Sequence, residues 1–163
     1  MIGKITPAPP IPKGTNSVTV TFTKPKRAVS RVFLHCSASD SPAHDDVAVM
    51  DKWHRERGFA EVGYHYFITK KGVLQIGRDI EKTPAAQQGH NTGTIAICLH
   101  GLKAANFTAL QFTVLYLLCQ KINAAYGGKV TFHGHKEVAA KDCPVFNYRH
   151  VLKLDAQGHM MPI

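Results

Sequence analysis

The stretch RVFLHCS, residues 31–37, is the segment that most directly indicates the fold. It is a short run rich in β-forming residues that ends in polar ones, which is typical of a buried strand. Its C-terminal end carries His35, so the strand would present an imidazole at one edge of a sheet. Side chains of neighbouring strand residues point to opposite faces, and Cys36 is therefore a poor partner for His35 in a shared site.

Two helices and four more strands are predicted after this segment. A helix over residues 45–57 ends at Gly58, and a second helix runs from the capping box Thr108–Gln111 to the glycines at 127 and 128. The expected apolar face of the second helix consists of Leu110, Val114, Leu117, Leu118, Ile122 and Ala125. Strands are predicted over residues 64–69, 73–77, 94–99 and 129–132, the first two as a hairpin. This order predicts an α/β fold: a single domain with a central mixed β-sheet flanked by helices.

The composition is that of one soluble globular domain, with 163 residues, a hydrophobic fraction of 44% and a mean hydropathy of −0.13. We assign this domain to residues 29–163. Residues 1–28 are rich in proline and are interpreted as an extended arm with one short edge strand at residues 18–22. No apolar run approaches the roughly 20 residues that span a bilayer, and the N-terminus lacks the apolar region of a secretory signal.

The formal net charge of +9 favours an anionic partner, which could be nucleic acid, a membrane surface or the cell wall. The basic residues are dispersed, and the one cluster, at residues 24–27, is too short to indicate specific nucleic-acid binding. The four cysteines match no disulfide framework and no C-x-x-C pair. We therefore expect reduced thiols, with Cys98 and Cys119 as core residues.

The stretch HGHKEVAAKDCP, residues 133–144, places His135 and Cys143 eight positions apart. If the strand before it lies beside the strand of His35, then His35, His135 and Cys143 converge at one sheet edge. Two imidazoles and one thiolate are a three-ligand zinc set that leaves the fourth tetrahedral position to water, which is typical of catalytic zinc. His133 is a rival ligand, because it lies two positions before His135 and could share its face.

Four segments together resemble the zinc N-acetylmuramoyl-L-alanine amidases, a group that includes a small phage amidase known as a lysozyme and the peptidoglycan recognition proteins. These segments are VFLHCSAS, EVGYHYFITKKG, GHNTGTIAICLHG and GHKEVAAKDCP, in the order of the family. The resemblance covers about residues 31–150. It implies a Zn²⁺ cofactor with His35, His135 and Cys143 as metal ligands, and it leaves His133 a supporting role.

The same resemblance implies roles for four further residues. Tyr64 corresponds to the tyrosine that faces the zinc-bound water, and Lys141 to the lysine that stabilises the developing negative charge, so both are expected to be catalytic. His90 and Asn91 lie in the segment that borders the substrate groove, and they are expected to bind substrate.

The implied activity is hydrolysis of the amide between N-acetylmuramic acid and L-alanine in peptidoglycan. We expect a monomeric phage endolysin that stays in the host cytoplasm until a holin lets it reach the wall. The alternatives are a secreted toxin or muropeptide-recycling amidase and a non-catalytic module that binds peptidoglycan or a polymerase. The presence of Cys143 favours the cleaving enzyme, because non-cleaving relatives typically lack this cysteine and recycling enzymes typically carry aspartate there.

Overall fold

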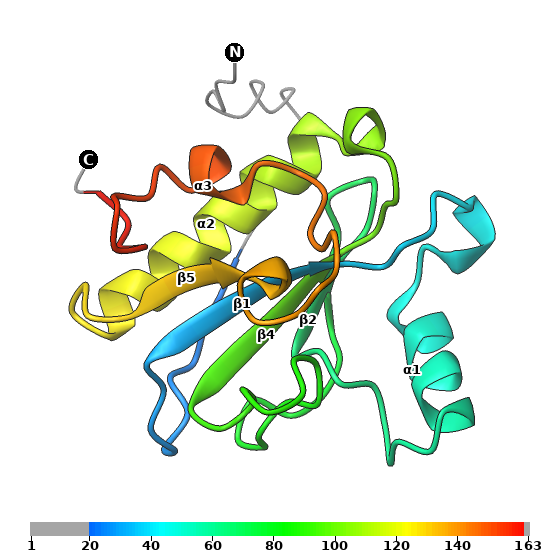
Figure 1. Cartoon of the computed structure of the whole chain (residues 1–163), viewed down its shortest axis with the longest axis horizontal. Helices are drawn as coiled ribbons and strands as arrows, with labels where there is room; N and C mark the ends of the chain where they lie inside the picture. Colours follow the sequence, from blue (N-terminus) through cyan, green and yellow to red (C-terminus); the bar gives the residue numbers. More distant parts are fainter. Residues whose placement is uncertain (1–19, 162–163) are drawn as a thin grey trace.

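The computed structural model describes residues 20–161, which form one α/β domain around a five-stranded sheet (Figure 1). The strand order is β3-β2-β4-β1-β5. The strands are β1 (Arg31–Cys36), β2 (Tyr66–Ile68), β3 (Leu74–Ile76), β4 (Thr94–Leu99) and β5 (Thr131–Gly134). The strands β2, β4, β1 and β5 are parallel, and β3 is antiparallel to β2. The predicted mixed sheet is therefore confirmed, including the hairpin.

The domain also contains three α-helices and three short 3-10 helices, of which η3 and α3 follow the last strand. The α-helices are α1 (Val47–Glu56), α2 (Ala109–Ala125) and α3 (Tyr148–Val151). The 3-10 helices are η1 (Pro42–His44), η2 (Ala104–Asn106) and η3 (His135–Glu137). None of the helices in the described part of the chain combines the length and the apolarity needed to cross a membrane.

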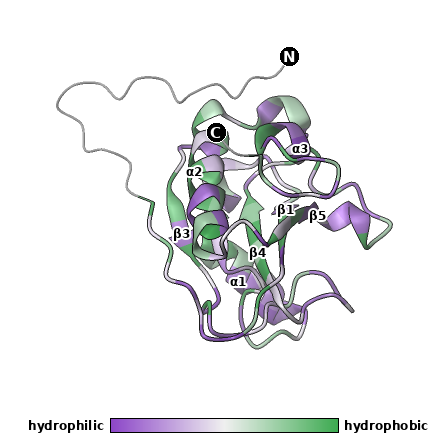
Figure 2. Cartoon of the chain, turned by 90° about the vertical axis from the view of Figure 1, so that its left-hand side faces the viewer, coloured by the Kyte–Doolittle hydropathy of each residue, from purple (hydrophilic) through white to green (hydrophobic). Residues whose placement is uncertain are grey.

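The two long helices pack on opposite faces of the sheet. Alternate residues of β1, Val32 and Leu34, belong to the large core that includes the buried side of α2. A smaller cluster joins Met50 of α1 to Phe67 of β2 and Cys98 of β4. Figure 2 shows the hydrophobic residues gathered along the central strands and α2. His35 alternates with Leu34, so it lies on the α1 face of the sheet, in register with Cys98.

The start of α2 follows its sequence signal. The Thr108 hydroxyl accepts a hydrogen bond from the Gln111 backbone N–H at 3.1 Å, and the Gln111 side chain accepts one from the Thr108 N–H at 2.9 Å. The predicted buried face is only partly right. Leu110 is 41% exposed, whereas Leu115 and Cys119 are fully buried. The helix is apolar around most of its surface, so its pattern does not single out the face that meets the sheet.

Several boundaries differ from the sequence prediction. The first helix and the two strands of the hairpin are each shorter than expected. The strand expected at residues 129–132 is β5, which begins two residues later and continues to Gly134. Residues 1–19 of the proline-rich arm lie outside the described residues. The edge strand predicted at residues 18–22 falls partly on described residues, and residues 20–22 form no strand. Val20 is nevertheless buried, and Phe22 packs on the core with its ring 6.3 Å from the ring of Tyr126.

Candidate metal centre and active site

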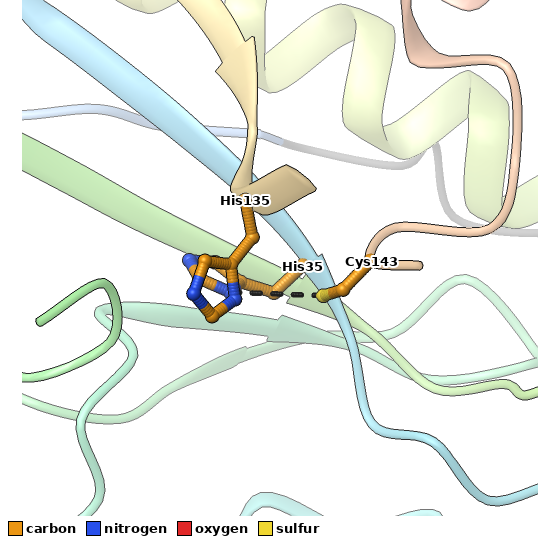
Figure 3. Close-up of side chains that lie close together, drawn as sticks. All are labelled: His35, His135 and Cys143. Carbon is orange, nitrogen blue, oxygen red and sulfur yellow. Dashed lines mark hydrogen bonds between the residues drawn. The ribbon is translucent and has the colours of Figure 1, made fainter. Parts of the chain in front are cut away.

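The three expected ligands meet at the C-terminal edge of the parallel strands. His35 is the penultimate residue of β1, His135 begins η3 directly after β5, and Cys143 lies in the loop that follows. Strands β1 and β5 are parallel neighbours, so their C-terminal ends deliver the two histidines to one place. The ligating atoms of the three side chains all lie within 4.8 Å of one another (Figure 3). His35 Nδ1 is 3.9 Å from Cys143 Sγ, and the imidazole centroids are 4.7 Å apart.

Burial keeps both imidazoles neutral. The His35 side chain is 1% exposed, and burial, reinforced by the neighbouring His135, lowers the pKa of His35 to about 3. Burial, together with the positive charge of Lys141, also lowers the pKa of His135. A neutral imidazole has a lone pair to offer a metal, whereas an imidazolium has none. These two side chains are therefore in the protonation state that metal binding needs.

Cys143 is held against Cys36. The Cys36 backbone N–H points at Cys143 Sγ from 3.4 Å, although the Cys36 side chain belongs to the core on the α2 side. The protein atoms alone raise the pKa of Cys143, first through its contact with the Cys36 thiol and then through burial. A bound divalent cation would reverse this tendency, because a coordinating thiol is deprotonated. Two neutral imidazoles and one cysteine suit a single zinc ion with an open fourth position.

A large cleft opens beside this centre, with a volume of about 1110 Å³. His135 and Cys143 line the cleft together with Lys141 and Tyr64. Residues of α1 and the turn after it also line the cleft, among them Met50, Trp53, His54, Arg57 and Phe59. The cleft therefore exposes the potential metal site to a substrate much larger than a single amino acid.

The two expected catalytic residues stand at this centre in different environments. The Tyr64 ring lies 5.1 Å from the His35 ring and 5.2 Å from the His54 ring. Burial raises the pKa of Tyr64 well above its usual value, so the phenol keeps its proton at neutral pH. Lys141 is exposed and lines the same cleft as His135 and Cys143, and its positive charge contributes to lowering the pKa values of His35 and His135.

Of the two expected substrate-binding residues, only Asn91 lines the cleft in the described part of the chain. Asn91 lines the cleft, but its Oδ1 accepts hydrogen bonds from the backbone N–H groups of Ala86 and Gln87 at 3.0 and 2.9 Å. His90 does not line the cleft within the described part of the chain; its carbonyl accepts a hydrogen bond from the Gln87 side chain at 3.4 Å. Asn91 therefore stabilises its own loop as well as facing the cleft.

His133 supports the corner that delivers His135. It lies outside the three-residue cluster, with Nδ1 2.8 Å from Glu137 Oε1 and Nε2 2.7 Å from Thr131 Oγ1. Glu137 also accepts hydrogen bonds from the Gly134 N–H at 2.9 Å and from the Tyr148 hydroxyl. Gly134 packs so tightly that a Cβ there would lie 2.5 Å from the Tyr148 ring. This network fixes the turn between β5 and η3.

Sequence reasoning missed two polar residues at the site. The fully buried Gln87 places its Oε1 2.8 Å from His35 Nε2. His54 lines the cleft and accepts a hydrogen bond at Nδ1 from the Gly63 N–H at 2.8 Å. His54 carried a weak signal, because it lies beside Trp53 on a predicted amphipathic helix. Gln87 lies in an irregular loop, and no periodic pattern marks it.

Comparison with known proteins finds a matching family and several relatives. The family model described as N-acetylmuramoyl-L-alanine amidase matches residues 25–146. The endolysin of Klebsiella phage KP32 is 34% identical over 136 residues, which cover 80% of this chain and 89% of that protein. The endolysin of Escherichia phage T7 is 34% identical over 132 residues, or 77% of this chain and 87% of that one. These relatives do not favour the recycling, toxin or non-catalytic alternatives.

Solved structures support the fold. The N-acetylmuramoyl-L-alanine amidase LysC from Clostridium intestinale URNW superposes with a TM-score of 0.70 at 23% identity, covering 83% of this chain and 93% of that one. The Ph2119 endolysin from Thermus scotoductus bacteriophage Ph2119 gives a TM-score of 0.69 at 22% identity, covering 87% and 90%. The family match spans well over half of the sequence and includes the ligand cluster of β1 and η3. The chain therefore belongs to the N-acetylmuramoyl-L-alanine amidase family.

Proposed function

We propose that this amidase hydrolyses the amide between the lactyl group of N-acetylmuramic acid and L-alanine in peptidoglycan, with zinc held by His35, His135 and Cys143. One observation carries the proposal: the three ligating atoms lie within 4.8 Å of one another at the side of a large cleft. Bound there, zinc would polarise the scissile carbonyl and lower the pKa of a water molecule to about 7.

Lys141 and Tyr64 complete the chemistry in this proposal. Attack on the carbonyl carbon places negative charge on the carbonyl oxygen, and the Lys141 ammonium, which lines the same cleft as His135 and Cys143, would stabilise that charge. The Tyr64 hydroxyl remains protonated, because burial raises its pKa, so it donates a hydrogen bond to the attacking water or to the oxyanion. His90 and Asn91 border the path of the substrate in the same proposal.

We further infer that the protein acts as a monomeric phage endolysin that reaches the wall from the host cytoplasm through a holin. Its support is that the relatives of 34% identity are named endolysins. Expression in a bacterial host tests this role. Lysis should require a co-expressed holin, and lysis without one would contradict the holin-dependent route.

The catalytic proposal is tested by Cys143→Ser. We expect this variant to keep the fold and the binding to purified sacculi, to lose stoichiometric zinc and to release no peptide from peptidoglycan. Cys119→Ser is the matched control, because Cys119 is a fully buried thiol on α2, on the other face of the sheet. Full peptide release by Cys143→Ser, or a wild-type preparation that binds no zinc and still cleaves, would overturn the proposal.

A further inference from the structure

Gln87 is fully buried, and its side-chain amide makes three hydrogen-bond contacts. Its Oε1 lies 2.8 Å from His35 Nε2. Its Nε2 donates to Thr94 Oγ1 at 2.8 Å and to the His90 carbonyl at 3.4 Å. Burying an amide is costly unless it is hydrogen-bonded, so this arrangement holds the side chain in one orientation.

The hydrogen bonds that link the Asn91 carbonyl, Thr94, Gln87 and His35 form a series, and the Asn91 carbonyl fixes the direction of each one. The Asn91 carbonyl can only accept, so Thr94 Oγ1 uses its single hydrogen in the 2.8 Å bond to Asn91 O. The Thr94 oxygen must then accept from the Gln87 amide nitrogen. This places the Gln87 NH₂ toward Thr94 and its carbonyl oxygen toward His35. Since that oxygen can only accept, the hydrogen in the 2.8 Å contact belongs to His35 Nε2.

The consequence lies on the other nitrogen of the ring. A neutral imidazole carries one hydrogen, so a hydrogen on Nε2 leaves a free lone pair on Nδ1. Nδ1 is the atom that faces Cys143, at 3.9 Å from Sγ (Figure 3). The hydrogen-bond chain that begins at the Asn91 carbonyl therefore directs the His35 lone pair toward Cys143.

We propose that Gln87 is a positioning residue for the metal centre: it fixes His35 in the tautomer whose Nδ1 is free to bind the ion, while Thr94 and Asn91 fix Gln87. The inference rests on the proposed zinc site. Asn91 contributes twice, because its Oδ1 also accepts from the Gln87 backbone N–H at 2.9 Å. Partners that orient a ligating histidine in this way typically account for about 10–100-fold in metal affinity.

The test compares zinc affinities in competition with a chromophoric chelator. Gln87→Met keeps the approximate volume and removes the acceptor, and we expect zinc to bind about 10–100-fold more weakly. Gln87→Glu keeps an acceptor for His35 Nε2–H and should bind zinc at least as tightly as the wild type. Gln111→Met is the matched control, because Gln111 is also fully buried and donates to the Ile68 and His100 carbonyls. It should lose stability but keep the zinc affinity of the wild type.

A second measurement needs no variant. The ¹⁵N chemical shifts of the imidazole in labelled zinc-free protein distinguish the two tautomers, and we expect the hydrogen of His35 on Nε2. Wild-type zinc affinity in Gln87→Met, or a hydrogen on Nδ1 of His35, would overturn the inference. Failure of the wild type to bind zinc stoichiometrically would instead overturn the proposed function, so the two failures are distinguishable.

Discussion

At the scale of single residues, the different surroundings of Tyr64 and Lys141 suit them to different roles beside the expected metal ligands. Tyr64 is half-buried between two histidine rings and keeps its proton, because burial raises its pKa. Lys141 is exposed at the cleft, where a flexible cation can follow the charge that develops on the substrate. In the proposed mechanism, Tyr64 donates a hydrogen bond and Lys141 supplies a charge.

Removing either group should slow cleavage without releasing the metal. We expect Tyr64→Phe to lower kcat by about 10²–10⁴-fold, as loss of a proton donor or acceptor does. Lys141→Met should lower kcat by about 10²–10³-fold, as loss of an oxyanion-stabilising group does. Peptide release from purified peptidoglycan gives the rates, and elemental analysis should find unchanged zinc. Lys121→Met, on an exposed position of α2, is the control. A Lys141→Met enzyme with the wild-type kcat would exclude the assigned role.

His65 is a buried histidine whose two ring nitrogens both have hydrogen-bond partners, and it makes stability depend on pH. It is 1% exposed; its Nδ1 accepts from the Ala96 N–H at 3.1 Å, and its Nε2 lies 2.8 Å from the Lys82 carbonyl. Burial lowers the pKa of His65 to about 4. Because the unfolded chain takes up a proton near pH 6.5 and the folded protein does not, stability is full above that pH and is lost as the pH falls toward 4.

This linkage predicts the urea-unfolding behaviour. Between about pH 6.5 and pH 4 the free energy of unfolding should fall, with His65 contributing at most about 3 kcal/mol. His54 acts in the same direction, since burial also lowers its pKa to about 4. The variant His65→Gln should be less stable at pH 7 but should lose less stability on acidification. An equal pH dependence in the variant and the wild type would show that His65 is not the group responsible.

At the scale of secondary-structure elements, α2 packs its buried side against one face of the sheet. Its buried apolar residues are Val114, Leu115, Leu118, Cys119 and Ile122. They pack on Val32, Leu34 and their neighbours in β1 and β4. This packing stabilises β1 on the face of the sheet opposite His35. It therefore supports the strand that carries His35, although α2 does not line the cleft.

Leu118 and Leu110 give a matched pair on α2. Leu118 is fully buried, and Leu118→Ala should lower the free energy of unfolding by about 2–5 kcal/mol, because it removes buried methyl groups and leaves a cavity. Leu110 is 41% exposed, so Leu110→Ala should change stability by only about 0.5 kcal/mol. Urea denaturation measures both. Equal losses would mean that the face of α2 is assigned wrongly.

At the scale of the whole molecule, the basic residues that give the net charge of +9 are dispersed along the sequence, apart from the short cluster at residues 24–27. Dispersed positive charge acts over distance, so it should strengthen binding to the anionic groups of the cell wall without specifying the bond that is cut. Long-range attraction of this kind depends on salt, whereas contacts within the cleft depend on it much less.

The expected result is a salt-sensitive association with the wall. The bound fraction of Cys143→Ser on purified sacculi should fall when salt is raised from about 0.1 M to about 1 M, because the screening length shortens from about 10 Å to about 3 Å. Co-sedimentation measures this fraction, with an uncharged polysaccharide as control. Binding that does not change with salt would assign the affinity to the cleft alone.

The overall arrangement was largely predictable from local patterns. The RVFLHCS strand, the hairpin around residues 70–72 and the capping box at Thr108 depend on residues close together in sequence, and all three form as expected. The ligand set of His35, His135 and Cys143 was suggested by spacing and strengthened by family motifs. The structure brings these residues together because β1 and β5 are parallel neighbours.

Other features depend on contacts that sequence spacing does not encode. Gln87 reaches His35 across 52 residues, and the Cys36 N–H reaches Cys143 across 107. The buried face of α2 was also decided by the sheet, which covers Leu115 and leaves Leu110 in solvent. The sequence by itself determined the elements and the chemical types at the centre, because periodicity and capping are local. Only the tertiary structure decided which nitrogen of His35 faces Cys143, because that depends on a loop that brings the buried Gln87 side chain to His35.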